Sequence, residues 1–86
     1  MQTTMKTVGP AYFTAYRSLK LSRDPEGVLV ADFHTNNDPL TFTAQDHTDF
    51  VEAFYRISQD RDNKIVILTG ADGEFIPGID FSSFGI

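Results

Sequence analysis

A glycine-punctuated loop after a short apolar strand holds the residues best placed to do chemistry. Residues 64–69 read Lys-Ile-Val-Ile-Leu-Thr, and glycines follow at positions 70, 73 and 78, the last in a Pro-Gly pair. Glycine lets the backbone take positive φ and approach a ligand closely. The backbone N–H groups of Ile79 and Asp80 would then lie at the start of a following helix and face a substrate. In that place they could stabilise the negative charge of an enolate or of a tetrahedral oxyanion.

The same loop also has a simpler interpretation. It could be a plain strand-to-helix turn whose glycines serve geometry only, and Asp80 could be the N-cap of the helix rather than a general base. The glycine spacing matches neither a dinucleotide-binding fingerprint nor a phosphate-binding Gly-Lys-Ser/Thr loop. Spacing alone therefore leaves both interpretations open.

Two histidines and one phenylalanine are further candidates. His34 ends a predicted strand, where a hydrogen bond within the turn is a safer expectation than contact with a ligand. His47 shares the apolar face of a predicted helix, which favours a semi-buried histidine over a metal or acid/base site with Asp46 and Asp49. Phe42 precedes that helix, so it could line a pocket or act as a hydrophobic staple.

The elements that would position these residues follow one another as hairpin, helix and strand. Residues 18–23 alternate apolar and polar side chains, an Asp-Pro-Glu-Gly turn follows, and residues 28–34 form a second strand. Thr43 and Asp46 resemble a capping box, and the helix after them has its apolar face at Phe50, Ala53, Phe54 and Ile57. Residues 64–69 are typical of a parallel strand buried on both faces. Residues 80–84 look like the start of a second helix.

Length and composition limit the class of function. The chain has 86 residues, a net charge of −5, no cysteine, eight Phe and three Tyr. An acidic chain is a poor partner for nucleic acid or for an anionic membrane. The lack of cysteine excludes disulfides and thiolate metal sites, and it fits a reducing, cytoplasmic compartment. The aromatic surface exceeds what so short a chain buries, so we expect the opening piece of a larger α/β protein.

Two segments are expected within the chain. Residues 1–17 are predicted to form an N-terminal arm, mobile over Met1 to Pro10, whose Tyr12, Phe13 and Tyr16 pack on the domain that follows. Residues 18–86 are predicted to be the N-terminal part of that domain.

Four segments together resemble a known family. Residues 27–30 (Gly-Val-Leu-Val), the loop 34–43, residues 60–70 (Asp-Arg-Asp-Asn-Lys-Ile-Val-Ile-Leu-Thr-Gly) and residues 74–81 (Glu-Phe-Ile-Pro-Gly-Ile-Asp-Phe) resemble the N-terminal part of the crotonase superfamily, the enoyl-CoA hydratase/isomerase family. The resemblance implies a spiral of ββα turns, present here as hairpin, helix, parallel strand and the start of a second helix. It implies homotrimers that often pair into hexamers. It also implies an oxyanion hole whose first donor is the backbone N–H of Ile79, with the second donor and the acid/base residues beyond residue 86.

Departures from the family pattern bear on the substrate. Leu40 stands where members that bind coenzyme A usually have Asn, and Asp38 adds negative charge near the expected place of the thioester's phosphates. The pattern is closer to the 6-oxocamphor hydrolase branch, which cleaves a carbon–carbon bond of cyclic β-diketones without coenzyme A. That branch has tryptophan at the position of Phe42. We therefore expect no cofactor, a catalytic role for Ile79, and substrate-binding roles for Phe42, Leu40, Gly78 and Asp80.

Three functions stay open at this point. The chain could be part of a hydrolase of cyclic β-diketones, or part of a hydratase or isomerase that acts on acyl-coenzyme A thioesters. It could also be a truncated, non-catalytic piece with a structural or assembly role. Because only one oxyanion donor is expected within the chain, we expect the isolated 86-residue form to be inactive.

Overall fold

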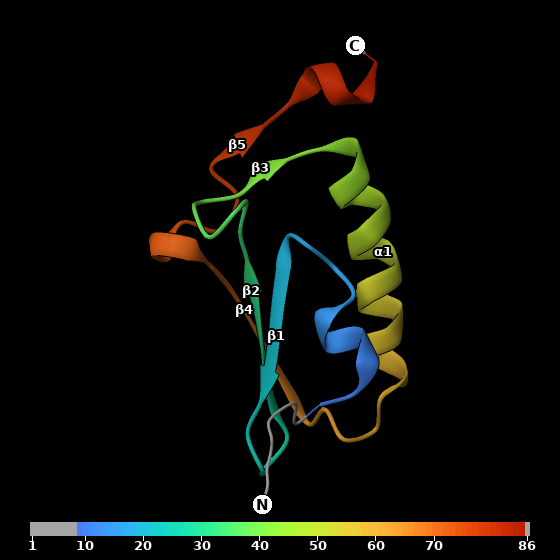
Figure 1. Ribbon diagram of the computed structural model, residues 1–86. Coiled ribbons are helices and arrows are strands. Elements are labelled where there is room, and N and C mark those ends of the chain that lie inside the picture. Colours follow the sequence, from blue (N-terminus) through green and yellow to red (C-terminus); the bar gives the residue numbers. More distant parts are fainter. Residues whose placement is uncertain (1–8, 86) are drawn as a thin grey trace, which may run out of the picture.

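A computed structural model describes residues 9–85 of the chain (Figure 1). The element order is a 3-10 helix (Ala11–Thr14), β1 (Leu19–Arg23), β2 (Val28–Phe33), β3 (Thr41–Phe42), α1 (Ala44–Gln59), β4 (Ile65–Gly70), a 3-10 turn (Ala71–Gly73), β5 (Gly78–Ile79) and a last 3-10 helix (Phe81–Phe84). Helix α1 lies along one face of the larger sheet, and β3 and β5 lie beyond one end of it. Within residues 9–85, no helix has the length and the apolar character needed to cross a membrane.

The larger sheet has three strands in the order β1-β2-β4. Strands β1 and β2 form the predicted antiparallel hairpin, and β4 pairs with β2 in parallel, as the sequence predicts. The hairpin turn closes where the N–H of Gly27 donates to the carbonyl oxygen of Asp24 at 3.1 Å. Gly27 has a φ of +92°, a conformation that glycine adopts without steric cost.

The core lies between this sheet and α1. Alternate residues of β2 point inward, so Leu29, Ala31 and Phe33 are buried, and they meet the apolar face of the helix at Phe50, Ala53 and Ile57. Burying a side chain such as Leu29 completely contributes about 1.5–3 kcal/mol. The predicted capping box is confirmed: Thr43 Oγ1 accepts from the Asp46 N–H, and Asp46 Oδ2 accepts from the Thr43 N–H, each at 3.1 Å.

A polar network ties the segment before β1 to the end of α1. Asp60 Oδ2 accepts hydrogen bonds from the Tyr12 hydroxyl at 2.7 Å and from Arg23 at 2.9 Å. The Arg23 guanidinium also donates to Asn63 Oδ1 at 2.7 Å and lies 5.1 Å from the ring centre of Phe13. These hydrogen bonds, that of Tyr12 first, hold the pKa of Asp60 below its usual range. Sequence reasoning missed this network.

The aromatic residues of the predicted arm pack on the core. Tyr12, Phe13 and Tyr16 are all buried. Tyr16 also donates from its hydroxyl to Glu52 of α1 at 3.1 Å. Met1 to Pro10 is the part of the arm that is predicted to be mobile. Residues 1–8 of it lie outside the described residues.

Strand β4 differs from its prediction. It is expected to be buried on both faces, yet Ile65, Val66, Ile67 and Leu68 are 41–57% exposed. Among the described residues β2 is the only neighbour of β4, because the sheet ends there. The apolar composition of β4 predicts that both its faces are covered. Residues 9–85 supply a neighbouring strand on one side only, so these side chains remain exposed.

Candidate functional site

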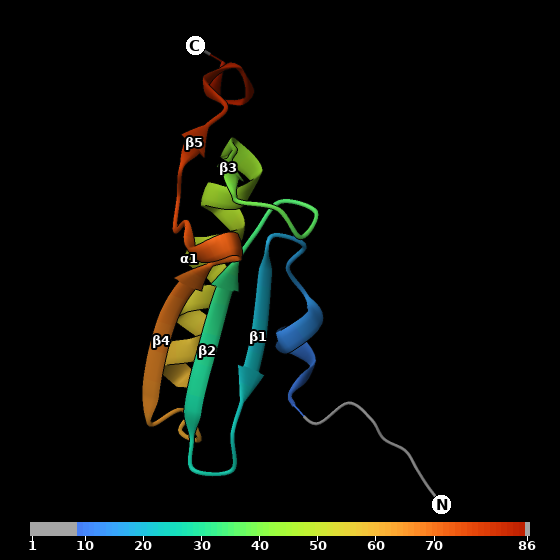
Figure 2. The ribbon, with the colours of Figure 1, turned by 90° about the vertical axis from the view of Figure 1, so that its left-hand side faces the viewer.

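Two short parallel strands bring together the two loops that the sequence marks as functional. β3 pairs with β5, with Thr41 opposite Gly78 and Phe42 opposite Ile79. Figure 2 shows this pair beyond the carboxyl ends of β2 and β4. Ligands of α/β proteins gather beyond the carboxyl ends of parallel strands. The candidate site is therefore the β3–β5 pair with the residues that flank it.

The register of the pair decides where the N–H of Ile79 points. The Asp80 N–H donates to the carbonyl oxygen of Phe42 at 2.8 Å. Successive N–H groups along an extended strand point to opposite edges, so the N–H of Ile79 is directed away from β3. A donor directed away from its neighbouring strand is available to a group outside the sheet.

Phe42 is the centre of an aromatic cluster at the amino end of α1. Its ring centre lies 5.8 Å from that of Phe50, 6.0 Å from that of Phe84 and 6.3 Å from that of His47. The contact with His47, four residues into α1, is the contact of a hydrophobic staple. Phe42 itself is half-buried, so one part of its ring remains accessible beside β5.

The other predicted substrate-binding residues lie at different depths. Leu40 has no exposed surface and belongs to the core. Gly78 is half-buried, and it does not have the positive φ that the sequence analysis expects of this loop: among the described glycines only Gly27, Gly73 and Gly85 do. A Cβ added at Gly78 would meet only Thr41 Oγ1, at 3.9 Å. Of the three glycines in this loop, Gly70 is the one without space for a side chain, because an added Cβ would collide with the Glu74 carbonyl.

The predicted second helix is a four-residue 3-10 helix, Phe81–Phe84. Asp80 occupies the N-cap position of this helix as predicted, but its side chain makes no cap hydrogen bond. Instead, Asp80 Oδ1 accepts from the Ser82 hydroxyl at 2.6 Å. A helix of four residues has only a small dipole, so a helix dipole is not the reason to expect anion stabilisation here. The reason is the orientation of the Ile79 N–H.

Ser83 attaches the β5 segment to α1, and sequence reasoning missed it. Its hydroxyl oxygen accepts from the Ala44 N–H at 2.9 Å and its hydroxyl donates to the Asp80 carbonyl at 2.7 Å. Ala44 is the first residue of α1, where the N–H has no partner within the helix. The only sequence signal was a pair of serines in a segment expected to be helical.

The two histidines differ in burial. His34 is buried and its Nδ1 accepts from the Asn37 N–H at 3.1 Å, so the predicted turn hydrogen bond is confirmed. Burial lowers the pKa of His34, with a smaller effect from Lys20 in the same direction. His47 is exposed, so its prediction as semi-buried is wrong; the buried residue of that turn is its neighbour Asp46. No group of three or more His, Cys, Asp or Glu side chains that could hold a metal ion occurs within residues 9–85.

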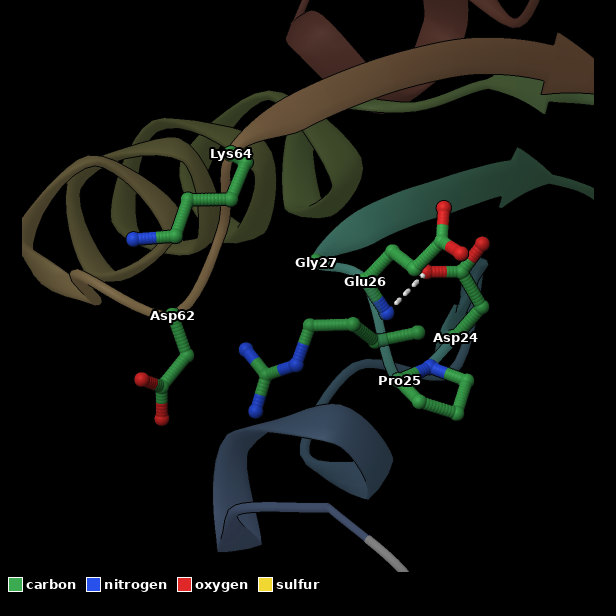
Figure 3. A pocket seen from close by; sticks show the side chains of 7 residues that line it. Asp24, Pro25, Glu26, Gly27, Asp62 and Lys64 are labelled. Atoms are coloured by element: carbon green, nitrogen blue, oxygen red, sulfur yellow. Dashed lines mark hydrogen bonds between the residues drawn. The ribbon is translucent and has the colours of Figure 1, made fainter.

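A pocket lies at the other end of the sheet, by the hairpin turn. It has a volume of about 570 Å³ and is lined by Arg23, Asp24, Pro25, Glu26, Gly27, Asp62 and Lys64. Figure 3 shows charged side chains of both signs around it, together with Pro25. It is remote from the carboxyl ends of the strands, and we assign no chemistry to it.

Comparisons with known proteins show what the whole chain is similar to. Neither a protein-family model nor a curated protein sequence matches the chain. Among solved structures, the chain matches ABDH, a β-diketone hydrolase from the cyanobacterium Anabaena sp. PCC 7120 bound to (S)-3-oxocyclohexyl acetic acid, with a TM-score of 0.86 and 48% sequence identity. The chain is similar to a β-diketone hydrolase. The likeness supports the crotonase-like relationship that the sequence motifs indicate.

The match to the Anabaena hydrolase covers 90% of this chain and 31% of that protein. This chain therefore spans about a third of the length of that hydrolase. A second structure, from a dehydratase/decarboxylase enzyme couple involved in polyketide β-branching, matches with a TM-score of 0.63 and 24% identity over 78% of this chain and 28% of that one. At that identity the second match speaks for the fold alone.

Proposed function

We propose that this chain forms the part of a β-diketone hydrolase that carries the first oxyanion donor. The observation that carries the proposal is the 48% identity to the Anabaena hydrolase over 90% of the chain. The departures at Asp38 and Leu40 from the pattern of coenzyme A-binding proteins point the same way. The activity proposed is that of a whole protein of which this chain supplies one part.

The proposed reaction is a hydrolytic carbon–carbon cleavage. Water adds to one carbonyl carbon of a cyclic β-diketone, and the bond from that carbon to the carbon shared by the two carbonyls then breaks. The electron pair of the broken bond forms the enolate of the second carbonyl, and the proton that water supplied ends on the shared carbon. The product is a keto acid. The compound bound to the Anabaena hydrolase has a ring ketone and a carboxymethyl arm, the two groups that cleavage of a bicyclic β-diketone would leave.

In this proposal the backbone of β5 supplies the charge stabilisation. The Asp80–Phe42 hydrogen bond supports it, because this bond turns the N–H of Ile79 away from β3. A fixed N–H that points at a developing oxyanion stabilises it without reorganisation. Phe42 would form an aromatic wall beside the substrate ring, with Gly78 and Asp80 as flanking backbone. Leu40, which is fully buried, would act by supporting Phe42 from the core side.

The proposal also covers the substrate, the compartment and the oligomeric state of the whole enzyme. The substrate is a neutral small molecule, and no cofactor takes part. We propose a cytoplasmic homotrimer or hexamer, in which further structure covers the exposed apolar side chains of β4. 6-Oxocamphor hydrolase remains the branch that the motifs resemble most.

A chimera tests the proposal without assuming what precedes or follows this chain. Residues 9–85 replace the matched segment of the Anabaena hydrolase, and the release of keto acid from a bicyclic β-diketone is followed by chromatography. We expect turnover within about tenfold of the parent enzyme, a difference of about 1.4 kcal/mol in transition-state stabilisation. An acyl-coenzyme A thioester, the substrate of the rival hypothesis, should not react.

The unmodified hydrolase is the positive control, and circular dichroism and melting temperature establish that the chimera is folded. A folded chimera that leaves the β-diketone intact would refute the proposed function. A folded chimera that turns over only the thioester would favour the coenzyme A alternative.

A further inference from the structure

A buried carboxylate oxygen at the amino end of α1 has no hydrogen-bond partner. Asp46 is 2% exposed, and its Oδ2 accepts from the Thr43 N–H in the capping box. Its Oδ1 makes no hydrogen bond. An ionised carboxylate oxygen only accepts, and leaving it buried without a donor or a cation is costly. An occupant from outside the chain would remove that cost.

A small polar pocket provides the space for such an occupant. Its volume is about 200 Å³, and Asp46 lines it together with Arg17, Ser18, Thr35, Asn36, Thr41 and Thr43. A water molecule occupies about 30 Å³ in the liquid, so the pocket has room for a small ion with part of its hydration shell. Its lining consists mainly of hydroxyl and amide groups around one carboxylate, which is a set of oxygen ligands.

The ligand set selects the class of ion. An anion would be repelled by Asp46. Divalent calcium takes 6–8 oxygen ligands that usually include several carboxylates, and no group of three or more His, Cys, Asp or Glu side chains that could hold a metal ion occurs within residues 9–85. One carboxylate oxygen among neutral oxygens suits a single positive charge. We propose that this pocket binds a monovalent cation, potassium, sodium or ammonium, through Asp46 Oδ1 and the surrounding hydroxyl and amide oxygens.

Two groups of the chain could compete with the ion, and neither takes its place. Two donors of the first helical turn are engaged, because the Ala44 N–H donates to Ser83 and the Asp46 N–H donates to Thr43. Arg17 lines the pocket but is exposed, and the two ion pairs within residues 9–85 are Arg23–Asp60 and Arg56–Glu52. No ion pair within residues 9–85 therefore neutralises Asp46, and its buried Oδ1 is left without a counter-charge.

The test compares the melting temperature of the full chain in potassium, sodium and ammonium chloride with that in choline chloride at equal ionic strength. Choline serves as the reference cation because the methyl groups on its nitrogen prevent close coordination by oxygen ligands. We expect a saturable rise of about 5–10 °C at ten times the Kd of the favoured ion. Asp46→Asn, which removes the charge and keeps the shape, should abolish the rise. Asp49→Asn makes the same charge change one turn along α1, outside the pocket lining, and should retain it.

A second variant keeps the test decisive if Asp46→Asn does not fold. Ser18→Ala removes a pocket hydroxyl that takes no part in the capping box, and it should weaken the affinity for the ion several-fold. Arg17→Gln should strengthen it, because a positive charge leaves the rim. Equal melting temperatures in all four salts, an undiminished rise in a folded Asp46→Asn, or an unchanged affinity in Ser18→Ala would each overturn the proposal.

Discussion

The hydroxyl oxygen of Ser83 accepts a hydrogen bond from the backbone N–H of Ala44 at 2.9 Å, although the two residues are 39 positions apart. Because the same hydroxyl donates to the carbonyl of Asp80, it connects the segment that carries Ile79 to the first turn of α1. The proposed oxyanion donor is thus positioned by two attachments, the β3–β5 pairing and this serine.

The first prediction concerns that attachment. Ser83→Ala leaves the Ala44 N–H without its partner, and it should lower the free energy of unfolding by about 1 kcal/mol, as the loss of a helix cap does. Ser82→Ala is the matched control, because the Ser82 hydroxyl reaches only Asp80, and it should stay within about 0.5 kcal/mol of the wild type. Urea unfolding measures both. Equal stability of the two variants would show that Ser83 does not fasten the segment.

The second prediction separates two glycines of the loop. Gly70→Ala places a Cβ against the Glu74 carbonyl, so it should destabilise the chain by about 1–3 kcal/mol through a forced backbone shift. Gly78→Ala meets open space beside Thr41 Oγ1 and should change stability little. Thermal unfolding of both variants measures the contrast, and a larger loss from Gly78→Ala would contradict the loop geometry described above.

The third prediction concerns pH. Hydrogen bonds from Tyr12 and Arg23 lower the pKa of Asp60 in the folded state, so the stability that this carboxylate contributes is fully present above its unfolded pKa of about 3.9. That contribution is lost as the pH falls from there through the lowered pKa of the folded state. Asp60→Asn should be less stable than the wild type at pH 6 and should approach it toward pH 2.

Urea unfolding between these pH values gives the difference curve for Asp60→Asn. Asp62→Asn removes a carboxylate from an exposed neighbour that makes no ion pair within the described residues, so it is the control for the loss of one negative charge. A difference curve for Asp60→Asn that stays flat over this pH range would mean that the Tyr12–Arg23–Asp60 network does not stabilise the fold.

The fourth prediction concerns the exposed strand. Ile65 to Leu68 of β4 are apolar and exposed at the edge of the sheet, an arrangement that favours pairing with another chain. We expect the 9.6 kDa chain to self-associate, and Ile67→Lys to shift it toward monomer. Val51→Lys adds the same charge at an exposed position of α1 and should leave association unchanged. Sedimentation equilibrium measures the association of each variant. A wild-type chain that stays monomeric at all concentrations would contradict this prediction.

The local elements could be predicted from the sequence because local patterns determine them. The alternation of residues 18–23, the Asp-Pro-Glu-Gly turn and the Thr43–Asp46 capping box all appear as expected. The parallel pairing of β4 with β2 followed from the order of strand, helix and strand. The family motif assigned Ile79 and Phe42 each to the site, but the pairing of β3 with β5 that places them opposite each other was not predicted.

The long-range contacts could not be predicted because no local signal encodes them. Ser83 meets Ala44, and Tyr12 and Arg23 meet Asp60, across 37 to 48 positions of sequence. The burial of a helix residue also depends on a small rotation, which is why Asp46 rather than His47 lies inside. Gly78 was expected to have positive φ from composition alone, yet the pairing with β3 keeps it extended.

The central claim is that the N–H of Ile79, and not its side chain, stabilises the oxyanion. In the active chimera, replacing residue 79 by its α-hydroxy acid turns that one N–H into an ester oxygen and keeps the side chain; the carbonyl of Gly78 also becomes a weaker hydrogen-bond acceptor. We expect kcat for the β-diketone to fall about 100- to 1,000-fold with the melting temperature nearly unchanged. Ile79→Val should keep turnover near normal, because it keeps the N–H.

The matched control is the same ester substitution at Asp80. It removes the 2.8 Å hydrogen bond to Phe42, so it should lower the melting temperature as well as the rate. The decisive value is kcat of the folded residue-79 ester: a fall of at least about 100-fold is the predicted result. An ester at residue 79 that keeps near-normal turnover in a folded protein would show that the oxyanion donor lies elsewhere.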